Sequence, residues 1–377
     1  MTLLKTYKTL PLTLARGEDV WVWDTAGKKY LDLYAGHAVC STGHCHPRVV
    51  RAIQEQAAKL IFYSNVAGLP LREEAAALLM RHAPGHAAVL FANSGAEANE
   101  NALKMARRHT GRTDVVALQA GFHGRTAGAM SVTGIEKYRK MSEPLVPGVS
   151  FVPLGEIPPL TDRTAAVILE PIQSMAGVRV APPDYLRELR ARCSKNGTVL
   201  IYDEVQTGIG RTGTMFYAGR HGVMPDLVTL AKGIASGIPL SAVLVSKEIA
   251  DRVQYGEYGA TFGAGPVAMA AMKATLEVVE TLLPGVIETS AHLAERARAV
   301  PGVREVRGVG LLVGIKIDGD APPLQKALLE KGVILGTADE PGVLRLLPPL
   351  TLQKEHVDLF IGVLRNELER PAVHQHP

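Results

Sequence analysis

The chain has 377 residues, of which 47% are hydrophobic and 21% charged, and its formal net charge is +4. This length fits two or three structural units of ordinary globular composition. The dispersed charges give no electrostatic reason for a nucleic-acid partner, and no apolar run is long enough to cross a membrane. The chain start lacks the apolar core of a signal peptide, and three cysteines give no disulfide framework, so we expect a cytoplasmic protein.

The first 50 residues predict a small N-terminal unit. Strand-like runs at 20–23 and 29–33 flank a turn signal and predict a hairpin. A loop with glycine and histidine then leads into a helix predicted over 48–60. Its His44, Cys45 and His46 are adjacent, and adjacent residues rarely converge on one ion, so we expect no metal site.

From residue 73 onward, strand-like and helical patterns alternate. The strands are predicted at 88–92, 115–119, 165–170, 199–202, 227–230 and 242–246, and the main helices at 96–109 and 183–195. This alternation predicts an α/β fold with a mostly parallel sheet covered by helices. A long helix from Pro266 to Leu283 is expected to end at Pro284-Gly285. We therefore place a large domain at 51–283, and expect residues 284–377, an α+β unit, to join residues 1–50 in a small domain.

Two predicted buried strands end in groups of opposite charge. The run at 199–202 is followed by Asp203, and the run at 227–230 is followed closely by Lys232. Ligands in α/β sheets usually sit at such strand ends. The pair suits pyridoxal phosphate (PLP), with the lysine holding the aldehyde as a Schiff base and the aspartate keeping the ring nitrogen protonated. A salt bridge between two loops is the alternative.

Two further loops follow predicted strands. Ser94-Gly95-Ala96-Glu97 opens a helix, and its free N–H groups could bind a phosphate or could simply form a capped helix start. In Gly121-Phe122-His123-Gly124-Arg125, the phenylalanine could stack on a planar ring and the arginine could bind a carboxylate. The same loop is also compatible with an ordinary surface arginine.

Three single residues can each be interpreted in two ways, as structural groups or as site residues. Glu170 ends an apolar strand and is either a group at the edge of the core or a site residue. Thr261 precedes the long helix and is either a cap or a phosphate ligand. Arg345 interrupts an apolar strand, so its face of the strand is either wet or supplied with an anionic partner.

Taken together, the motifs resemble those of the class III aminotransferases, which are PLP enzymes of fold type I. The resemblance spans nearly the whole chain, through GHCHP, SGAEANENALKMAR, GFHGRT, EPIQ, IYDEVQTGIGRTG, LAKGIASGIP, GATFG and LRLLPPL. It implies a large domain built on a sheet of the seven-stranded type and a smaller domain from both termini. It also implies a homodimer with shared active sites.

The resemblance assigns a role to each matching residue. Lys232 would carry the cofactor and shuttle a proton, Asp203 would face the ring nitrogen, and Glu170 would lie beside the ring. The other cofactor-binding residues that it implies are Gly95, Ala96, Phe122, Val205, Gln206 and, from the neighbouring subunit, Thr261. The substrate-binding residues that it implies are Arg125, Ala260 and Arg345.

The motifs are most similar to those of family members that act on N-acetylornithine. This implies transfer of its ω-amino group to 2-oxoglutarate, in arginine biosynthesis. Met175 stands where the family usually has a glutamate that can pair with the arginine at position 345. We therefore expect Arg345 to stay available to donors with a carboxylate or other polar group. The alternative function is a broad ω-amine or 4-aminobutyrate transaminase.

Overall fold

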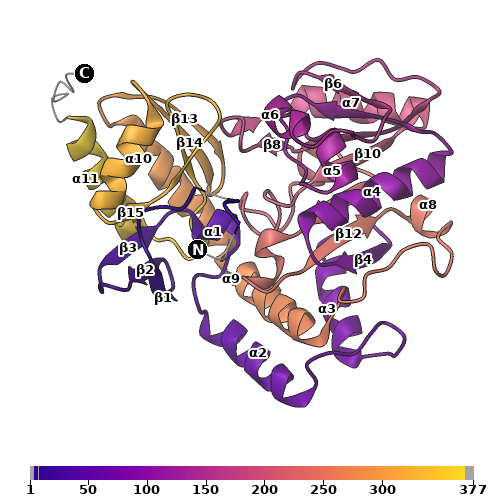
Figure 1. The fold of residues 1–377 in the computed structure, drawn as a ribbon, viewed down its shortest axis with the longest axis horizontal. Helices are drawn as coiled ribbons and strands as arrows, with labels where there is room; N and C mark the ends of the chain where they lie inside the picture. The colour runs from indigo at the N-terminus through magenta and orange to yellow at the C-terminus, as the bar shows by residue number, and fades with distance from the viewer. Residues whose placement is uncertain (1–3, 7, 370–377) are drawn as a thin grey trace.

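A computed structural model describes residues 4–6 and 8–369, which form two lobes joined by a long helix (Figure 1). The larger lobe is built around a seven-stranded sheet. In sheet order the strands are β4 (Ala88–Ala92), β12 (Ser241–Val245), β11 (Leu227–Leu230), β10 (Val199–Asp203), β7 (Thr164–Leu169), β5 (Asp114–Leu118) and β6 (Val149–Val152). Only β12 runs in the direction opposite to the other six strands, so the predicted mostly parallel α/β sheet is confirmed.

Both faces of this sheet are buried, which explains the nearly continuous apolar runs of its strands. In β10, Val199 and Ile201 pack with helix α4 (Gly95–Thr110) in one hydrophobic core. Leu200 and Tyr202 point the other way, into the core that includes α7 (Pro183–Asn196). The period-two alternation of a strand thus divides one apolar run between two cores.

The smaller lobe combines both ends of the chain (Figure 1). The predicted hairpin is present as β2 (Trp21–Asp24) and β3 (Lys29–Asp32), preceded by β1 (Leu14–Glu18). Strand β3 pairs in parallel with β15 (Val333–Ile334) from the C-terminal part. A second sheet contains β13 (Val303–Val309), β14 (Leu312–Ile317), β17 (Val343–Leu346) and β16 (Gly336–Thr337), in that order.

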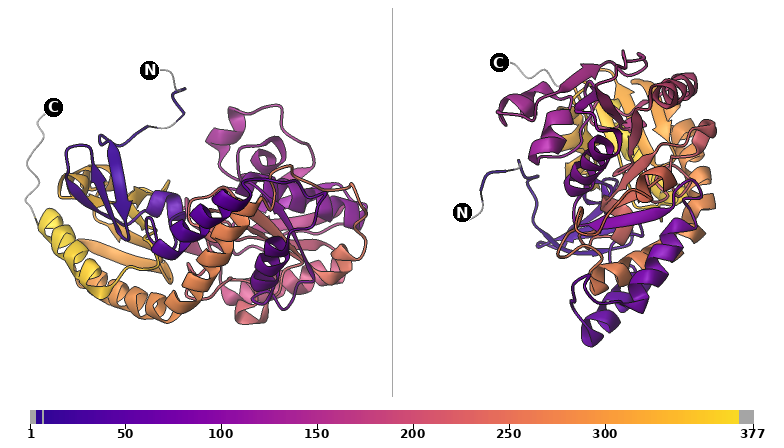
Figure 2. Two further views of the ribbon diagram at one scale, coloured as in Figure 1. Left: turned by 90° about the horizontal axis from the view of Figure 1, so that it is seen from below. Right: turned by 90° about the vertical axis from the view of Figure 1, so that its right-hand side faces the viewer.

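The helix predicted to end at Leu283 is instead α9 (Pro266–Arg298), so that prediction was wrong. Pro284 and Gly285 lie on its exposed side, where water can satisfy the carbonyl that the proline leaves without a donor. The opposite face continues to bury Val286 and Leu293, and this tertiary packing keeps the helix going. Figure 2 shows α9 running from one lobe to the other, where it packs against α2 (Pro47–Lys59), α3 (Pro70–Met80) and α11 (Lys354–Leu368).

The remaining elements are short. They comprise α1 (Ala35–Ala38), α5 (Ala127–Val132), α6 (Glu136–Lys140), α8 (Lys247–Ala250), α10 (Ala321–Glu330), the 3₁₀ helices η1 (Arg220–Gly222) and η2 (Lys232–Ala235), and the strand pair β8 (Ile172–Gln173) and β9 (Arg179–Val180). No helix among the described residues is both long and apolar enough to cross a bilayer.

Candidate active site

Most of the predicted site residues meet at one edge of the seven-stranded sheet. Strands β5, β7, β10 and β11 are parallel, so their carboxyl ends lie side by side. Phe122 follows β5, Glu170 follows β7, Asp203 ends β10 and Lys232 follows β11. Strand β4 has the same direction, because β12 is antiparallel to both β4 and β11, and it delivers Gly95 to this edge. Such an edge is where α/β sheets usually bind ligands.

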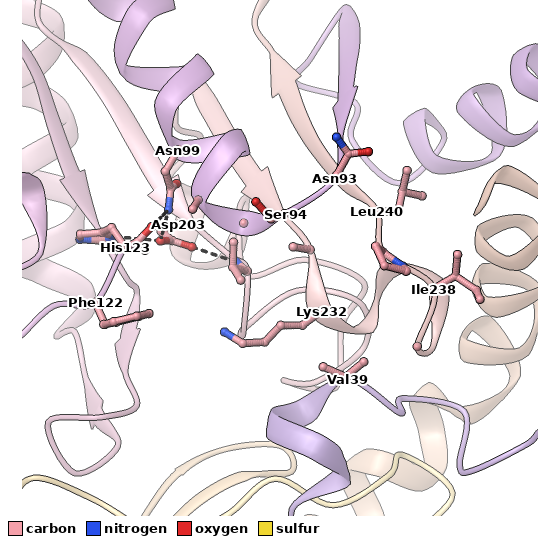
Figure 3. Close-up of a pocket in the computed structure, with 17 residues that line it drawn as sticks. Val39, Asn93, Ser94, Asn99, Phe122, His123, Asp203, Lys232, Ile238 and Leu240 are labelled. Atoms are coloured by element: carbon pink, nitrogen blue, oxygen red, sulfur yellow. Dashed lines mark hydrogen bonds and ion pairs between the residues drawn. The ribbon is translucent and has the colours of Figure 1, made fainter. Parts of the chain in front are cut away.

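Two adjoining cavities open at this edge. One, of about 390 Å³, is lined by Lys232 and Asp203 together with the turn that starts α4. The other, of about 580 Å³, shares Lys232 and Asp203 and extends to Arg345 in the smaller lobe. In Figure 3 the Lys232 side chain extends toward the side of the first cavity where Phe122 and Asp203 lie. Predicted residues that line one or both cavities are Gly95, Ala96, Phe122, Arg125, Glu170, Asp203, Val205, Gln206, Lys232 and Arg345.

Lys232 lies in an unusual backbone conformation. Its φ of 45° falls in the left-handed region, which non-glycine residues rarely adopt and which is found at functional sites. Burial lowers the pKa of its amine, while the charges of Asp203 and Glu170 act in the opposite direction. A lysine with a lowered pKa has more of its amine in the neutral, nucleophilic form.

Asp203 is surrounded by hydrogen-bond donors. Its Oδ2 accepts from Nδ2 of Asn99 at 2.7 Å and from Nδ1 of His123 at 2.8 Å, and its Oδ1 accepts from the backbone N–H of Val205 at 3.0 Å. These donors supply hydrogen bonds to a carboxylate in a residue that is only 3% exposed. The loop-to-loop salt bridge considered above is not formed, because the acceptor bonds of Asp203 go to these three donors and not to Lys232.

Glu204, next in sequence, has a different position. Its carboxylate accepts hydrogen bonds from the backbone N–H groups of Tyr217 and Ala218, both at 2.6 Å, and from the Thr207 hydroxyl. Burial raises the pKa of Glu204 to about 7. It lines neither of the two cavities, so of these adjacent carboxylates only Asp203 can reach a ligand there.

The turn after β4 has the shape expected of an anion-binding helix start. Ser94 caps α4 by accepting from the Glu97 N–H at 3.2 Å. The Glu97 side chain accepts from the backbone and side chain of Asn93, not from the Ser94 N–H. A Cβ on Gly95 would lie 2.9 Å from both methyl groups of Val205. Only glycine therefore allows α4 to begin this close to the loop after β10, which leaves its first N–H groups facing the cavity.

Glu170 holds the loop that carries Phe122. Its Oε1 accepts from the Phe122 N–H at 2.7 Å. Burial raises the pKa of Glu170 to about 7, opposed by the charge of His123. The sequence predicts that Glu170 is either a group at the edge of the core or a site residue. It lines the larger cavity and also holds the Phe122 loop in place.

Arg345 is buried, with only 6% of its surface exposed. Its guanidinium donates to two neutral hydroxyls, Tyr34 at 2.7 Å and Ser174 at 3.3 Å. No ion pair of Arg345 occurs among residues 4–6 and 8–369, and its side chain lines the larger cavity, so an anionic partner would have to come from a ligand. Gly314 and Gly336 flank Arg345 on the neighbouring strands. The missing side chain of Gly336 leaves room for the Tyr34 ring. A buried cation with neutral partners is an attractive site for a ligand carboxylate.

The other predicted residues are more peripheral. Arg125 is exposed, and its guanidinium carbon lies 4.7 Å from the centroid of the Tyr138 ring at the mouth of the larger cavity. Thr261 is exposed and Ala260 partly exposed, and neither lines the two cavities of its own chain. The structure therefore does not bring these last two residues together with Lys232 within one chain.

Sequence reasoning missed several residues around this site. Asn99 and His123 contact Asp203, while Tyr34 and Ser174 contact Arg345. One signal was available for Asn99, which lies four residues after Gly95 and hence on the same face of the helix. The partners of the others lie 80 or more residues away in sequence, where no local pattern reveals them.

Comparison with known proteins agrees with this geometry. Residues 3–368 match the family described as aminotransferase class-III. The acetylornithine aminotransferase of Methanothermobacter thermautotrophicus is 42% identical, covering 96% of this chain and 95% of its own. The acetylornithine aminotransferase of Streptomyces coelicolor is 43% identical, and the match covers 100% of this chain and 95% of that protein. A solved aminotransferase from Bacillus anthracis superposes with a TM-score of 0.91 at 30% identity, covering 98% and 96%. With the family match extending over nearly the whole sequence, the chain belongs to the class III aminotransferases and is an aminotransferase.

Proposed function

We propose that this aminotransferase moves the ω-amino group of N-acetylornithine, or a close analogue, to 2-oxoglutarate, with PLP as its cofactor. The observation that carries the proposal is the placing of the Lys232 amine and the Arg345 guanidinium in one cavity, beside Asp203. The names of the relatives in Methanothermobacter thermautotrophicus and Streptomyces coelicolor support this donor. The product would be a semialdehyde, with glutamate formed from the keto acid.

The residues present fit PLP. The glycine turn at Gly95 and Ala96 suits its phosphate, Phe122 can cover its ring, and Lys232 can hold it through the amine. Asp203 lines the cavity and has an acceptor position left for a ring N–H. When bound, PLP acts as an electron sink for the carbon that carries the amino group. Lys232 then moves the proton at that carbon, and its lowered pKa makes the neutral, proton-accepting form of the amine more accessible.

Substrate carboxylates would be held by Arg345 at the inner end of the larger cavity and by Arg125 at its mouth. Each charge-assisted hydrogen bond to such a carboxylate contributes about 1.5–3 kcal/mol. Two arginines suit a dicarboxylic keto acid, which presents one carboxylate at each end. Gln206 lines the same cavity and would lie near the phenolic oxygen of the cofactor.

One observation favours a second candidate, a broad ω-amine or 4-aminobutyrate transaminase. Met175 lines the larger cavity together with Arg345, and a methionine cannot form an ion pair with a guanidinium. The choice between the candidates then depends on which donors reach the cavity, not on the chemistry at Lys232.

We also propose a cytoplasmic homodimer with shared sites that serves arginine biosynthesis. Exposed apolar side chains lie on the loop bearing Thr261 and on the segment that meets it, where Asn65 donates to the carbonyls of Ala260 and Gly263. They are Ile61, Val66 and Phe262, which are 70%, 87% and 64% exposed. An exposed apolar patch of this kind is typical of a protein interface. A second copy on this patch would explain how Thr261 reaches a cofactor phosphate, and Ala260 a substrate, although neither faces its own chain's cavities.

The donor panel is the decisive experiment. Purified protein loaded with PLP is assayed with N-acetylornithine, 4-aminobutyrate and a simple primary amine, each with 2-oxoglutarate, and glutamate formation is measured. We expect the highest kcat/KM for N-acetylornithine. A comparable kcat/KM for all three donors would favour the second candidate. Lys232→Ala should lower turnover by several orders of magnitude, since it removes the group that binds the cofactor and moves the proton.

A further inference from the structure

The Asp203 carboxylate has one hydrogen-bonding position left for a ligand. A carboxylate can accept about four hydrogen bonds. Oδ2 takes two, from Asn99 and His123, and Oδ1 takes one, from the Val205 N–H. The remaining position belongs to Oδ1, and Asp203 lines both cavities. In Figure 3, Asn99 lies above Asp203 and His123 to its left, whereas Phe122 and the end of Lys232 lie below it.

The orientation of the Asn99 amide is fixed by a residue that has no contact with the cavities. Asn99 is 1% exposed, and its Oδ1 accepts from the Thr229 hydroxyl at 2.7 Å. Its Nδ2 then donates both to Asp203 Oδ2 and to the backbone carbonyl of His123, each at 2.7 Å. The flipped amide would place its oxygen against two acceptors and its nitrogen against a hydroxyl. The contacts therefore allow one orientation, with the donor toward Asp203.

His123 completes the arrangement. Its backbone N–H donates to the Thr133 hydroxyl at 3.0 Å, and its Nδ1 faces Asp203 at 2.8 Å. Its Nε2 is buried and has no partner among the described residues. Because Nδ1 faces a carboxylate that accepts, it carries the proton of this hydrogen bond. Through its bond to the His123 carbonyl, Asn99 also connects Asp203 to the loop that carries Phe122.

We propose that Asn99 is a positioning residue for the reaction. Thr229 orients the Asn99 amide, and the amide holds the Asp203 carboxylate with the open position of Oδ1 toward the ring nitrogen of bound PLP. The inference rests on the cofactor part of the proposed function and is independent of the amine donor. It adds a residue of helix α4 and a residue of β11 to the groups that position the cofactor. In β11, Thr229 is the register partner of Asp203.

The variant Asn99→Asp tests this directly because it keeps the size of the side chain. An aspartate can still accept from Thr229, but it presents a carboxylate oxygen to Asp203 in place of the N–H donor. Two carboxylates at hydrogen-bonding distance share one proton, so Asp203 would lose part of its charge. The matched control is Asn101→Asp on the same helix, where Nδ2 donates to the Glu97 carbonyl at 2.8 Å and Asn101 lines neither cavity.

The readout is the affinity of the cofactor-free protein for PLP relative to an analogue with carbon in place of the ring nitrogen, measured by fluorescence titration. The wild type and Asn101→Asp should prefer PLP. Asn99→Asp should reduce this preference about tenfold or more, the size expected for one charge-assisted interaction. Thr229→Val should also reduce the preference for PLP, because it leaves the Asn99 amide free to turn. Thr229→Ser keeps the hydroxyl and should retain the wild-type preference.

A preference that stays at the wild-type ratio in both Asn99→Asp and Thr229→Val would overturn the proposal. The two Thr229 variants give the same test if Asn99→Asp does not fold. Failure of the proposed function looks different: a wild type that binds neither compound would contradict the cofactor assignment. A wild type that binds PLP but leaves N-acetylornithine unchanged would contradict only the donor.

Discussion

The Tyr34 hydroxyl accepts a hydrogen bond of 2.7 Å from Nη2 of Arg345, which joins the two ends of the chain inside the smaller lobe. The same hydroxyl lies 3.0 Å from Nδ1 of His37. A Cβ on Gly336 would come within 2.4 Å of the Tyr34 ring, so the tyrosine is packed tightly over this strand. The N-terminal segment thus determines where the guanidinium of Arg345 stands in the cavity.

Replacing the tyrosine should therefore weaken keto-acid binding. Tyr34→Phe keeps the ring but removes the acceptor that holds Nη2. We expect the KM for 2-oxoglutarate to rise about three- to tenfold. This corresponds to the loss of one hydrogen bond to the Arg345 guanidinium, offset in part by water that takes the place of the Tyr34 hydroxyl. Steady-state kinetics with 2-oxoglutarate as the varied substrate measures this. Tyr255→Phe, at an exposed tyrosine that lines neither cavity, is the control and should leave KM unchanged.

A carboxylate introduced at position 175 should change the donor profile. Met175→Glu would supply an anionic partner for Arg345, which has only hydroxyl partners now. We expect the ratio of kcat/KM for N-acetylornithine to that for a simple amine to fall, because the guanidinium would be occupied when the donor binds. Met141→Glu is the matched control, since Met141 lines the same cavity but is 75% exposed. An unchanged ratio in Met175→Glu would contradict the idea that Arg345 is available.

Sharing of the active site between subunits can be tested by complementation. Lys232→Ala and Thr261→Ala should each be poorly active alone. If Thr261 serves the partner's site, a mixed dimer contains one fully wild-type site, and random exchange should restore roughly a quarter of wild-type activity. The measurement is activity after the two variants are mixed under conditions that exchange subunits. Activity no higher than the mean of the two variants would place Thr261 outside the partner's site.

The stability of the smaller lobe should depend on pH through His44. Burial acts to lower the pKa of His44, but its bond of 2.7 Å to Asp32 and its contact with Cys40 raise that pKa to about 10. The folded protein holds this proton more tightly than the unfolded chain, where the pKa is about 6.5. The stabilisation is therefore complete below about pH 6.5 and is lost as the pH rises toward about 10.

Urea unfolding at pH 6 and pH 9.5 measures this effect. His44→Gln, which keeps a donor for Asp32 but cannot titrate, should remove about 2 kcal/mol of the pH dependence of the unfolding free energy. The control is His292→Gln, whose pair with Asp358 is more exposed. If the wild type and His44→Gln lose the same free energy between the two pH values, the ion pair with Asp32 does not carry the effect.

Much of the fold and the centre of the site follow from the sequence. Apolar runs that alternate with helical patterns specify parallel strands, because only such strands need both faces buried. Asp203 and Lys232 directly follow two such runs, and parallel strands end at a common edge. Their proximity could therefore be predicted from local patterns, and so could Gly95 and Phe122, which follow strands at the same edge.

The tertiary structure alone decided the rest. The continuation of α9 through Pro284 depends on what packs against its far side, and the neutral partners of Arg345 come from distant loops. The contacts of Asn99 with Asp203 and Thr229 join three elements that are remote in sequence. Sequence patterns report which side chains turn inward, because burial follows the period of each element. They do not report which inward-facing polar groups meet, because that depends on the order in which the strands and helices pack.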